Sequence, residues 1–404
     1  MKNKITRRDF LNGTQVAIGA SLLSPWTEVF GSDATKFDLG REYYPPAKTG
    51  LRGSHDGSWQ TMHARVAGAT WPSGPIEEDY DLVVVGGGIS GLSAAHFFRR
   101  ENPTARILVL DNHDDFGGHA KRNEFTVDGR TQIAYGGTES IDTPSGYAEI
   151  SQALLKDIGV DVQRFYDYYD QDLYDKMDLS YGIAFDEGTY GERKLVTGYG
   201  SRPWKEFVAE TPLSEAGKAD LLRAFTDERD YLPGMSRDEK IALLSKISYR
   251  SYLKDYVKVD EQVLEMYQRW GMSYWCVGMD EVPAIYILGY TDGGGMPGLE
   301  HTVQQKEGRG VEPYIFHFPD GNASIARLLV RSLVPEALPG SSMEDSVTAR
   351  LDSIQNDKKG AALRIRLKST QVKAAHTKET KSDNETYVHS VYAHHVRAKN
   401  CSIA

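Results

Sequence analysis

Cysteine is scarce in this sequence. Cys276 and Cys401 are the only two among 404 residues, so one disulfide is the most the chain could form and a disulfide framework is excluded. No Cys-x-x-Cys pair occurs, and no cysteine–histidine spacing matches a zinc or iron–sulfur site. We therefore expect no cysteine-bound metal centre.

An excess of basic residues is also missing. The chain has 47 Lys and Arg against 57 Asp and Glu, a formal net charge of −10. Nucleic-acid binding needs a basic footprint, so we expect no nucleic-acid partner. The negative charge slightly favours cationic ligands through long-range attraction, although solubility alone is the stronger explanation.

Long apolar runs are missing as well. The apolar stretch Val16–Leu23 is too short to span a bilayer as a stable helix, and no other segment is long enough. We therefore expect no stable membrane insertion. With 404 residues, 40% of them hydrophobic, the chain is long enough for two domains with real cores.

What the sequence does contain is a strand–glycine–helix pattern. The apolar run Leu82–Val85 is typical of a buried parallel strand. Gly86–Gly91 follows and fits G-x-G-x-x-G, and Leu92–Arg99 has helical character. In this context the glycines allow a tight turn, close approach of a pyrophosphate and close helix packing, and the helix N-terminus attracts phosphate. The pattern predicts a dinucleotide site formed by Gly86, Gly88, Ile89, Ser90 and Gly91.

The next predicted strand, Arg106–Asp111, ends in an acid. Asp111 lies 25 residues after Gly86, a spacing that suits a ribose hydroxyl. An Asp here does not by itself distinguish a nicotinamide from a flavin dinucleotide. The glycine pair Gly117–Gly118, followed by His119, resembles the second glycine signature of the flavoprotein amine oxidase superfamily. That resemblance implies FAD, although the pair alone could be an ordinary loop.

The Gly-rich turn at residues 134–140 would suit a segment that passes near the flavin ring. The alternative is a plain turn.

The N-terminus resembles an export signal. Thr6–Leu11 contains Arg7 and Arg8 and matches the twin-arginine pattern, ahead of the moderately apolar Val16–Leu23. We expect residues 1–34 to be a signal peptide read by the twin-arginine translocase, which places the mature protein in the periplasm. Val29–Gly31 and Ser32–Ala34 are both plausible cleavage zones. The alternative is a chance arginine pair on a surface helix.

Several patterns occur further along the chain. Phe165–Asp175 is rich in Tyr and Asp, which suits alkylammonium ligands or, more often, a solvated helix face with tyrosines packed below. A turn at Asp320–Asn322 precedes a predicted helix at Ala323–Leu333, which Asn322 or Ser324 could cap. Leu363–Ala375 alternates with period two, as a half-exposed strand does, and Thr386–Ala398 indicates a strand pair.

Taken together, these blocks resemble a known family. The arm Pro45–His55, the two glycine motifs and Phe318–Ala323 together resemble the bacterial spermidine dehydrogenases, which are exported flavoproteins of the amine oxidase type. The resemblance implies an α/β fold: a Rossmann-type FAD-binding domain with an inserted α+β substrate domain. The implied divisions are an arm at 35–78, the first half of the FAD domain at 79–145, the insertion at 146–312 and the return to the FAD domain at 313–404.

The same resemblance implies an activity. Spermidine would be oxidised at a secondary amine by hydride transfer to the flavin, giving an aminoaldehyde and a diamine, with electrons leaving to a non-oxygen acceptor in the periplasm. Val372 occupies a position where relatives offer backbone contacts to adenine. Some relatives carry haem b, for which His55 and His63 are candidate ligands, although either could be a surface or packed histidine. The sequence identifies no catalytic residue.

The chain also departs from the family. Relatives continue well past Ala404, so the last residues predict a strand re-entering the FAD sheet in a C-terminally truncated chain. Two alternatives remain open: another amine oxidase-fold enzyme, such as a desaturase or an L-amino acid oxidase, and a truncated, non-catalytic FAD-binding remnant. The arm argues against other enzymes of the fold, and the abrupt end supports the remnant.

Overall fold

The computed structural model describes residues 44–48, 58–71, 74–288, 295–303, 316–376, 383–389 and 392–404. The predicted signal peptide and His55 lie outside this set. The chain divides into two compact units, one formed by Met1–Tyr169 and Glu312–Ala404, the other by Asp170–Val311. The insertion therefore begins at Asp170 rather than at residue 146. The reason is that Leu155, Ile158 and Phe165 pack in the core of the first unit.

A six-stranded sheet organises the first unit, in the order β7-β2-β1-β10-β9-β8. The first four of these strands run parallel, whereas β9 and β8 are antiparallel to their neighbours. Every residue of β2 and β7 is buried, as expected for parallel strands covered on both faces. The bounds are Glu78–Val85 for β1, Ile107–Leu110 for β2, Leu363–Arg366 for β7, Ser369–His376 for β8, Asp383–His389 for β9 and Tyr392–Ile403 for β10.

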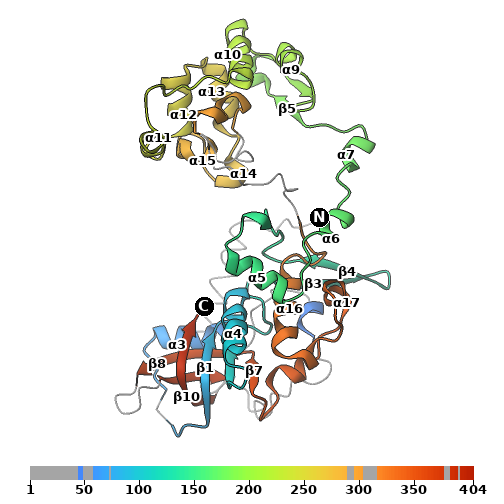
Figure 1. Ribbon diagram of the computed structural model, residues 1–404, viewed down its shortest axis with the longest axis vertical. Coiled ribbons are helices and arrows are strands. Elements are labelled where there is room, and N and C mark those ends of the chain that lie inside the picture. Colours follow the sequence, from blue (N-terminus) through green and yellow to red (C-terminus); the bar gives the residue numbers. More distant parts are fainter. Residues whose placement is uncertain are drawn as a thin grey trace, which may run out of the picture. The chain divides into compact units, whose positions relative to one another are not determined.

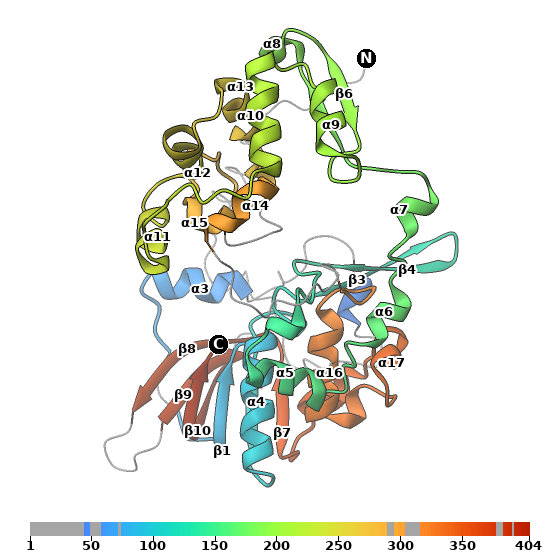
Figure 2. The ribbon, with the colours of Figure 1, turned by 45° about the horizontal axis from the view of Figure 1, so that its top comes forward.

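Two helices build the main core against this sheet. α4 (Ile89–Glu101) packs on β1 and β2, and α16 (Ala323–Leu333) packs on α4; Figures 1 and 2 show α4 lying along the sheet. Along β2, Ile107 and Val109 face this core, and Leu108 and Leu110 join a smaller apolar cluster with residues of β1 and β10. Alternate side chains of β2 thus pack into apolar clusters on opposite faces of the sheet, so both faces are buried. The first unit has the predicted α/β class.

Smaller elements complete the first unit. A hairpin, β3 and β4, follows the second glycine pair, and α3 packs on β8. Several short helices surround α16. The bounds are Ser58–Val66 for α3, Arg122–Val127 for β3, Arg130–Tyr135 for β4, Glu149–Asp157 for α5, Arg164–Tyr168 for α6, Met343–Thr348 for α17, Pro45–Ala47 for η1, Pro144–Gly146 for η2, Pro335–Ala337 for η6 and Ser353–Asp357 for η7.

The second unit is mainly helical and contains the hairpin of β5 and β6. Its core is rich in aromatic side chains, with Tyr249, Tyr252 and Tyr267 fully buried. The bounds are Leu173–Lys176 for α7, Gly182–Phe185 for β5, Glu187–Tyr190 for α8, Lys194–Thr197 for β6, Trp204–Glu210 for α9, Glu215–Thr226 for α10, Arg237–Leu244 for α11, Tyr249–Tyr252 for α12, Leu253–Val257 for the π-helical η3, Glu261–Gln268 for α13, Met272–Trp275 for α14, Ala284–Leu288 for α15 and Pro297–Thr302 for η5.

The structure confirms the predicted strands β1 and β2, the helix α16 and the pairing of β9 with β10. The single strand predicted over Leu363–Ala375 is wrong, because the chain turns at Lys368, whose φ is +51°, and forms β7 and β8. Side-chain capping of α16 is also wrong. Asn322 occupies the N-cap position, but its side chain donates to Thr138 Oγ1 and to the Ser140 carbonyl, and Ser324 Oγ donates to Asp320.

Within the part of the chain that the structure describes, no helix combines the length and the apolar character needed to cross a bilayer.

Candidate dinucleotide site

The first glycine turn connects β1 to α4. Gly86 has a φ of +111°, a region that L side chains rarely adopt. A Cβ on Gly91 would lie 1.9 Å from the Gly86 carbonyl oxygen, so only glycine lets the helix pack on the turn. Gly88 is the N-cap of the 13-residue α4, and the first turn of this fully described helix has no acidic side chain. Its free N–H groups and positive dipole end suit an anionic group.

Asp111 stands directly after β2 and holds this turn in place. Its Oδ2 accepts a hydrogen bond from Gly87 N–H at 2.6 Å, and its Oδ1 accepts one from His113 N–H at 2.7 Å. The residue is only 7% exposed. Asp111 therefore ties the end of β2 to the glycine turn, in addition to the ribose contact that the sequence predicts for it.

The second glycine pair meets the first turn. Gly117 N–H donates to the Gly87 carbonyl at 2.8 Å, and Gly117 forms a β-bridge with Gly88. Gly117 and Gly118 have φ values of +101° and +59°. A Cβ on Gly118 would lie 3.2 Å from Gly88 Cα, tighter than ordinary van der Waals contact. Two turns separated by some 30 residues in sequence thus form one surface made of backbone.

A cavity of about 650 Å³ opens onto this surface, a size within the range of small-molecule sites. Most of the residues that the sequence predicts for cofactor binding line it. Two do not belong to its described lining: Gly91, which packs inside the turn, and Val372, which sits half-buried at an irregularity of β8. The predicted residues on the cavity are Gly86, Gly88, Ile89, Ser90, Asp111, Gly117, Gly118 and His119.

Other parts of the lining were not predicted from the sequence. Asn112 and His113 follow β2, Ser369–Gln371 begin β8, and Ile403–Ala404 end β10. These segments stand at or just beyond the carboxyl ends of parallel strands, where ligands bind in open α/β sheets, so that rule could have found them. Thr138, after β4, lies in the Gly-rich turn at residues 134–140 that the sequence offered as a segment near the flavin ring, whereas Met62, on α3, carries no comparable sequence signal.

Of the two candidate haem ligands, the structure describes His63 but not His55. His63 lies exposed on α3, with its ring centroid 5.1 Å from that of Trp59. Within the described residues there is no group of three or more His, Cys, Asp or Glu side chains that could hold a metal ion. Haem ligation by His55 or His63 stays a prediction.

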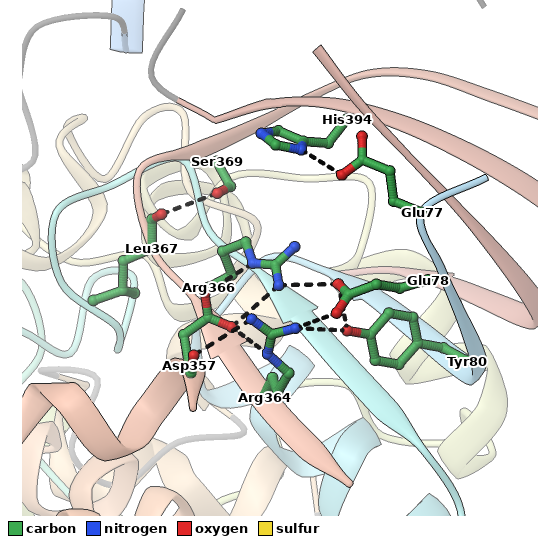
Figure 3. Close-up of polar contacts among 9 residues, drawn as sticks. All are labelled: Glu77, Glu78, Tyr80, Asp357, Arg364, Arg366, Leu367, Ser369 and His394. Atoms are coloured by element: carbon green, nitrogen blue, oxygen red, sulfur yellow. Dashed lines mark hydrogen bonds and ion pairs between the residues drawn. The ribbon is translucent and has the colours of Figure 1, made fainter. Parts of the chain in front are cut away.

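A charged network joins Glu78, at the start of β1, to Arg364 and Arg366 of β7. Glu78 Oε1 accepts from Arg364 at 2.5 Å and Oε2 from Arg366 at 3.1 Å, and Asp357 pairs with both arginines. Figure 3 shows the two guanidinium groups between these carboxylates, with Tyr80 beside them. Burial alone would raise the pKa of Glu78, but the two arginines hold that pKa below its usual value. The network links β7 to β1 across β2 and neutralises two nearly buried arginines.

A family model described as "NAD(P)-binding Rossmann-like domain" matches residues 84–157. This range includes both glycine turns and Asp111. The match and the sheet order agree that the first unit has a Rossmann-like dinucleotide-binding fold with a parallel sheet.

Two curated relatives match parts of the chain. An oxidoreductase, PigB, from Serratia sp. (strain ATCC 39006) is 45% identical over 53 residues, 13% of this chain and 7% of that protein. A carotenoid 3,4-desaturase from Haloarcula japonica is 32% identical over 188 residues, 45% of this chain and 31% of that protein. The matched region thus spans less than a third of either relative's length.

Among solved structures, a protein described as a protoporphyrinogen oxidase, from Exiguobacterium sp. 255-15, is similar over 82% of this chain and 60% of that chain. The sequence identity is 16% and the TM-score 0.43. A likeness at this TM-score carries no functional weight, so the function has to be argued from the site itself.

Proposed function

We propose that the first unit binds FAD. The observation that carries the proposal is the meeting of the two glycine turns at one cavity, where Gly117 N–H bonds the Gly87 carbonyl at 2.8 Å. The first turn and α4 would hold the pyrophosphate, and Asp111 would face the ribose. The resemblance of the second turn to the glycine signature of the flavoprotein amine oxidases favours FAD over NAD(P).

We further propose that the complete protein oxidises an aliphatic polyamine such as spermidine and passes the electrons to a non-oxygen acceptor. Bound FAD would supply the two-electron acceptor for a hydride from the carbon next to the amine nitrogen. The described residues would hold and orient the dinucleotide and exclude water from its phosphates. The resemblance of the arm and the glycine motifs to spermidine dehydrogenases supports this substrate class, and so does the acidic net charge of −10.

The test is the absorbance spectrum of the purified chain. The proposal predicts a flavin band at about 450 nm and bleaching of this band when spermidine is added without oxygen. A chain that neither carries nor takes up flavin would overturn the FAD proposal. A yellow chain that spermidine does not bleach would overturn the polyamine proposal and leave either another enzyme of this fold or an FAD-binding protein without catalytic activity.

A second candidate is a desaturase or another enzyme of the same fold, favoured by the 32% identity to the carotenoid 3,4-desaturase over 188 residues. The same anaerobic assay separates the candidates. Bleaching by a polyene substrate such as phytoene, or by an L-amino acid, with no response to spermidine, would favour this second candidate.

Export and haem binding are separate proposals. A reporter fused to residues 1–34 should reach the periplasm, and replacing Arg7 and Arg8 by lysine should abolish this, if the twin-arginine translocase reads the segment. Haem b should give a haemochrome spectrum that His55→Ala or His63→Ala removes. A haemochrome spectrum in both variants that is the same as in the wild type would contradict haem ligation by these histidines.

A further inference from the structure

A second cavity in the first unit is lined by aromatic side chains. It measures about 430 Å³ and lies between α6, the segment Phe316–Pro319 and α17. Phe165 stacks on Phe316 with ring centroids 5.4 Å apart and meets Phe318 edge-on at 5.2 Å. These three rings are buried, and Tyr168 and Tyr169 are exposed beside them. We call this cavity the aromatic pocket.

One carboxylate stands at the aromatic pocket. Among the described lining residues, Glu344 on α17 is the only Asp, Glu, Lys or Arg. Its Oε1 accepts a hydrogen bond from Tyr168 O–H at 3.2 Å and lies 3.0 Å from Arg164 Nη2. Arg164 is outside the lining, and its ion pair with Glu344 is well exposed, with side-chain exposures of 44% and 36%. Such exposed pairs contribute little free energy, so a cationic ligand can compete with Arg164 for the carboxylate.

We propose that the aromatic pocket binds an aliphatic polyamine, with its methylene chain against the rings and one ammonium group at Glu344. Aromatic faces attract cations, and a carboxylate beside them adds a charge-assisted hydrogen bond. A neutral aromatic ligand would gain nothing from Glu344, and an anion would be repelled by it. The choice of polyamine rests on the proposed function, but binding here requires no flavin.

The aromatic pocket is distinct from the dinucleotide cavity but is linked to it. The described linings of the two cavities share no residue. Phe316 forms a β-bridge with Ile141, and Asn322, a few residues beyond the pocket, donates to Thr138 Oγ1 at 2.8 Å. Thr138 lines the dinucleotide cavity. The segment that lines the aromatic pocket is thus connected by backbone and side-chain contacts to the segment that lines the dinucleotide cavity.

The sequence offered Phe165–Asp175 either as a surface for alkylammonium ligands or as a solvated helix face, and the two parts of this segment differ in the structure. Its first part, from Phe165 to Tyr169, contributes three aromatic side chains to the pocket. Its second part includes α7 in the other unit, where Leu173 and Tyr174 are exposed at 42% and 62%. Only the first part carries the proposal.

The experiment is calorimetric titration of spermidine into the full chain, with and without added FAD. Glu344→Gln should weaken spermidine binding about tenfold, and Tyr168→Leu about fivefold, because they remove the charge and a ring. Glu336→Gln and Tyr174→Leu are the matched controls. Both replace exposed residues outside the aromatic pocket and should leave the affinity unchanged.

A third variant gives a change of opposite sign. Arg164→Gln removes the competing cation and should tighten spermidine binding about threefold. Octane-1,8-diol, which has no charge, should bind far more weakly than octane-1,8-diamine. Equal binding of diol and diamine, or unchanged spermidine affinity in both Glu344→Gln and Tyr168→Leu, would overturn the proposal.

The two proposals fail separately in this design. Spermidine binding that responds to these variants in a chain that takes up no FAD would support the pocket and refute the flavin proposal. A flavin-loaded chain whose spermidine binding ignores all three pocket variants would refute the pocket and leave the flavin proposal standing.

Discussion

The two cavities of the first unit are built from different parts of the chain. The dinucleotide cavity is formed largely by backbone, where two glycine turns touch at Gly88 and Gly117. The aromatic pocket is formed by side chains, with rings from α6 and the segment Phe316–Pro319 and one carboxylate from α17.

This difference determines how each cavity responds to substitution. In a site made of backbone, a single added methyl group must displace main-chain atoms. In a site made of side chains, loss of one group removes one contact and leaves the rest. We therefore expect the dinucleotide cavity to be lost abruptly and the aromatic pocket to weaken in steps. The following predictions compare backbone with side-chain contributions in the first unit, from the largest effect to the smallest.

Gly91→Ala should have the largest effect. Its Cβ would lie 1.9 Å from the Gly86 carbonyl oxygen, so α4 must move away from the turn. We expect FAD affinity to fall at least about a hundredfold and the free energy of unfolding to fall by about 1–3 kcal/mol. The control is Gly146→Ala, where the nearest atom, Thr143 Cγ2, is 3.9 Å from the added Cβ. Equal FAD affinity in the two variants, measured by fluorescence titration, would contradict a backbone-built site.

Glu78→Gln should destabilise the unit with little effect on the cofactor. It leaves Arg364 and Arg366, whose side chains are 7% and 9% exposed, with less compensation. Because Glu78 itself is 23% exposed, we expect a loss of about 2 kcal/mol in unfolding free energy, less than for a fully buried pair. FAD affinity should change less than about threefold. The control is Glu77→Gln, which breaks only the exposed pair with His394.

The same carboxylate predicts a pH dependence. The pKa of Glu78 is lower in the folded than in the unfolded chain because of the two arginines. Its stabilising contribution is therefore complete above the unfolded pKa, about 4.3, and is lost as the pH falls through the folded value. Chemical denaturation at pH 7 and at lower pH should show a smaller difference between wild type and Glu78→Gln in acid. A constant difference would rule out this linkage.

Asp111→Asn should weaken FAD binding about tenfold, because one of its two backbone contacts, from Gly87 or His113, loses its acceptor. The matched control is Asp128→Asn in the exposed turn between β3 and β4. FAD affinity that is the same in both variants would show that Asp111 does not hold the turn.

Thr370→Val should have the smallest effect. It removes the hydrogen bond from Thr370 Oγ1 to Asn112 Oδ1, at 2.5 Å, beside the cavity. We expect a two- to threefold loss of FAD affinity. Thr126→Val, on an exposed position of β3, is the control. A loss as large as that of Gly91→Ala would show that side chains determine this cavity too.

The sequence could predict the parts of the site that follow local rules. A glycine at a positive φ and an acid at a strand end are encoded by neighbouring residues, so the positions of Gly86, Gly117 and Asp111 on the cavity could be predicted. Met62 reaches the cavity from α3, an element whose placement depends on distant packing. No local pattern gives that placement.

The strand predicted over Leu363–Ala375 shows the same limit. Arg364 and Arg366 alternate with Leu363 and Ile365, which is typical of a half-exposed strand. In the structure both arginines are buried, at 6% and 8% exposure. Glu78 and Asp357 neutralise them, and Glu78 lies almost 300 residues away in the sequence. A period-two pattern therefore does not show whether its arginine side chains face solvent or a carboxylate that is distant in the sequence.

The most direct test of the account is the identity of the cofactor that the chain binds. The full chain should be incubated with FAD, NAD and NADP together and then desalted, and the bound nucleotide should be released with acid and separated by chromatography. We expect about one FAD per chain for the wild type and almost none for Gly91→Ala. Release of NAD or NADP, or of no dinucleotide, from a folded wild-type chain would contradict it.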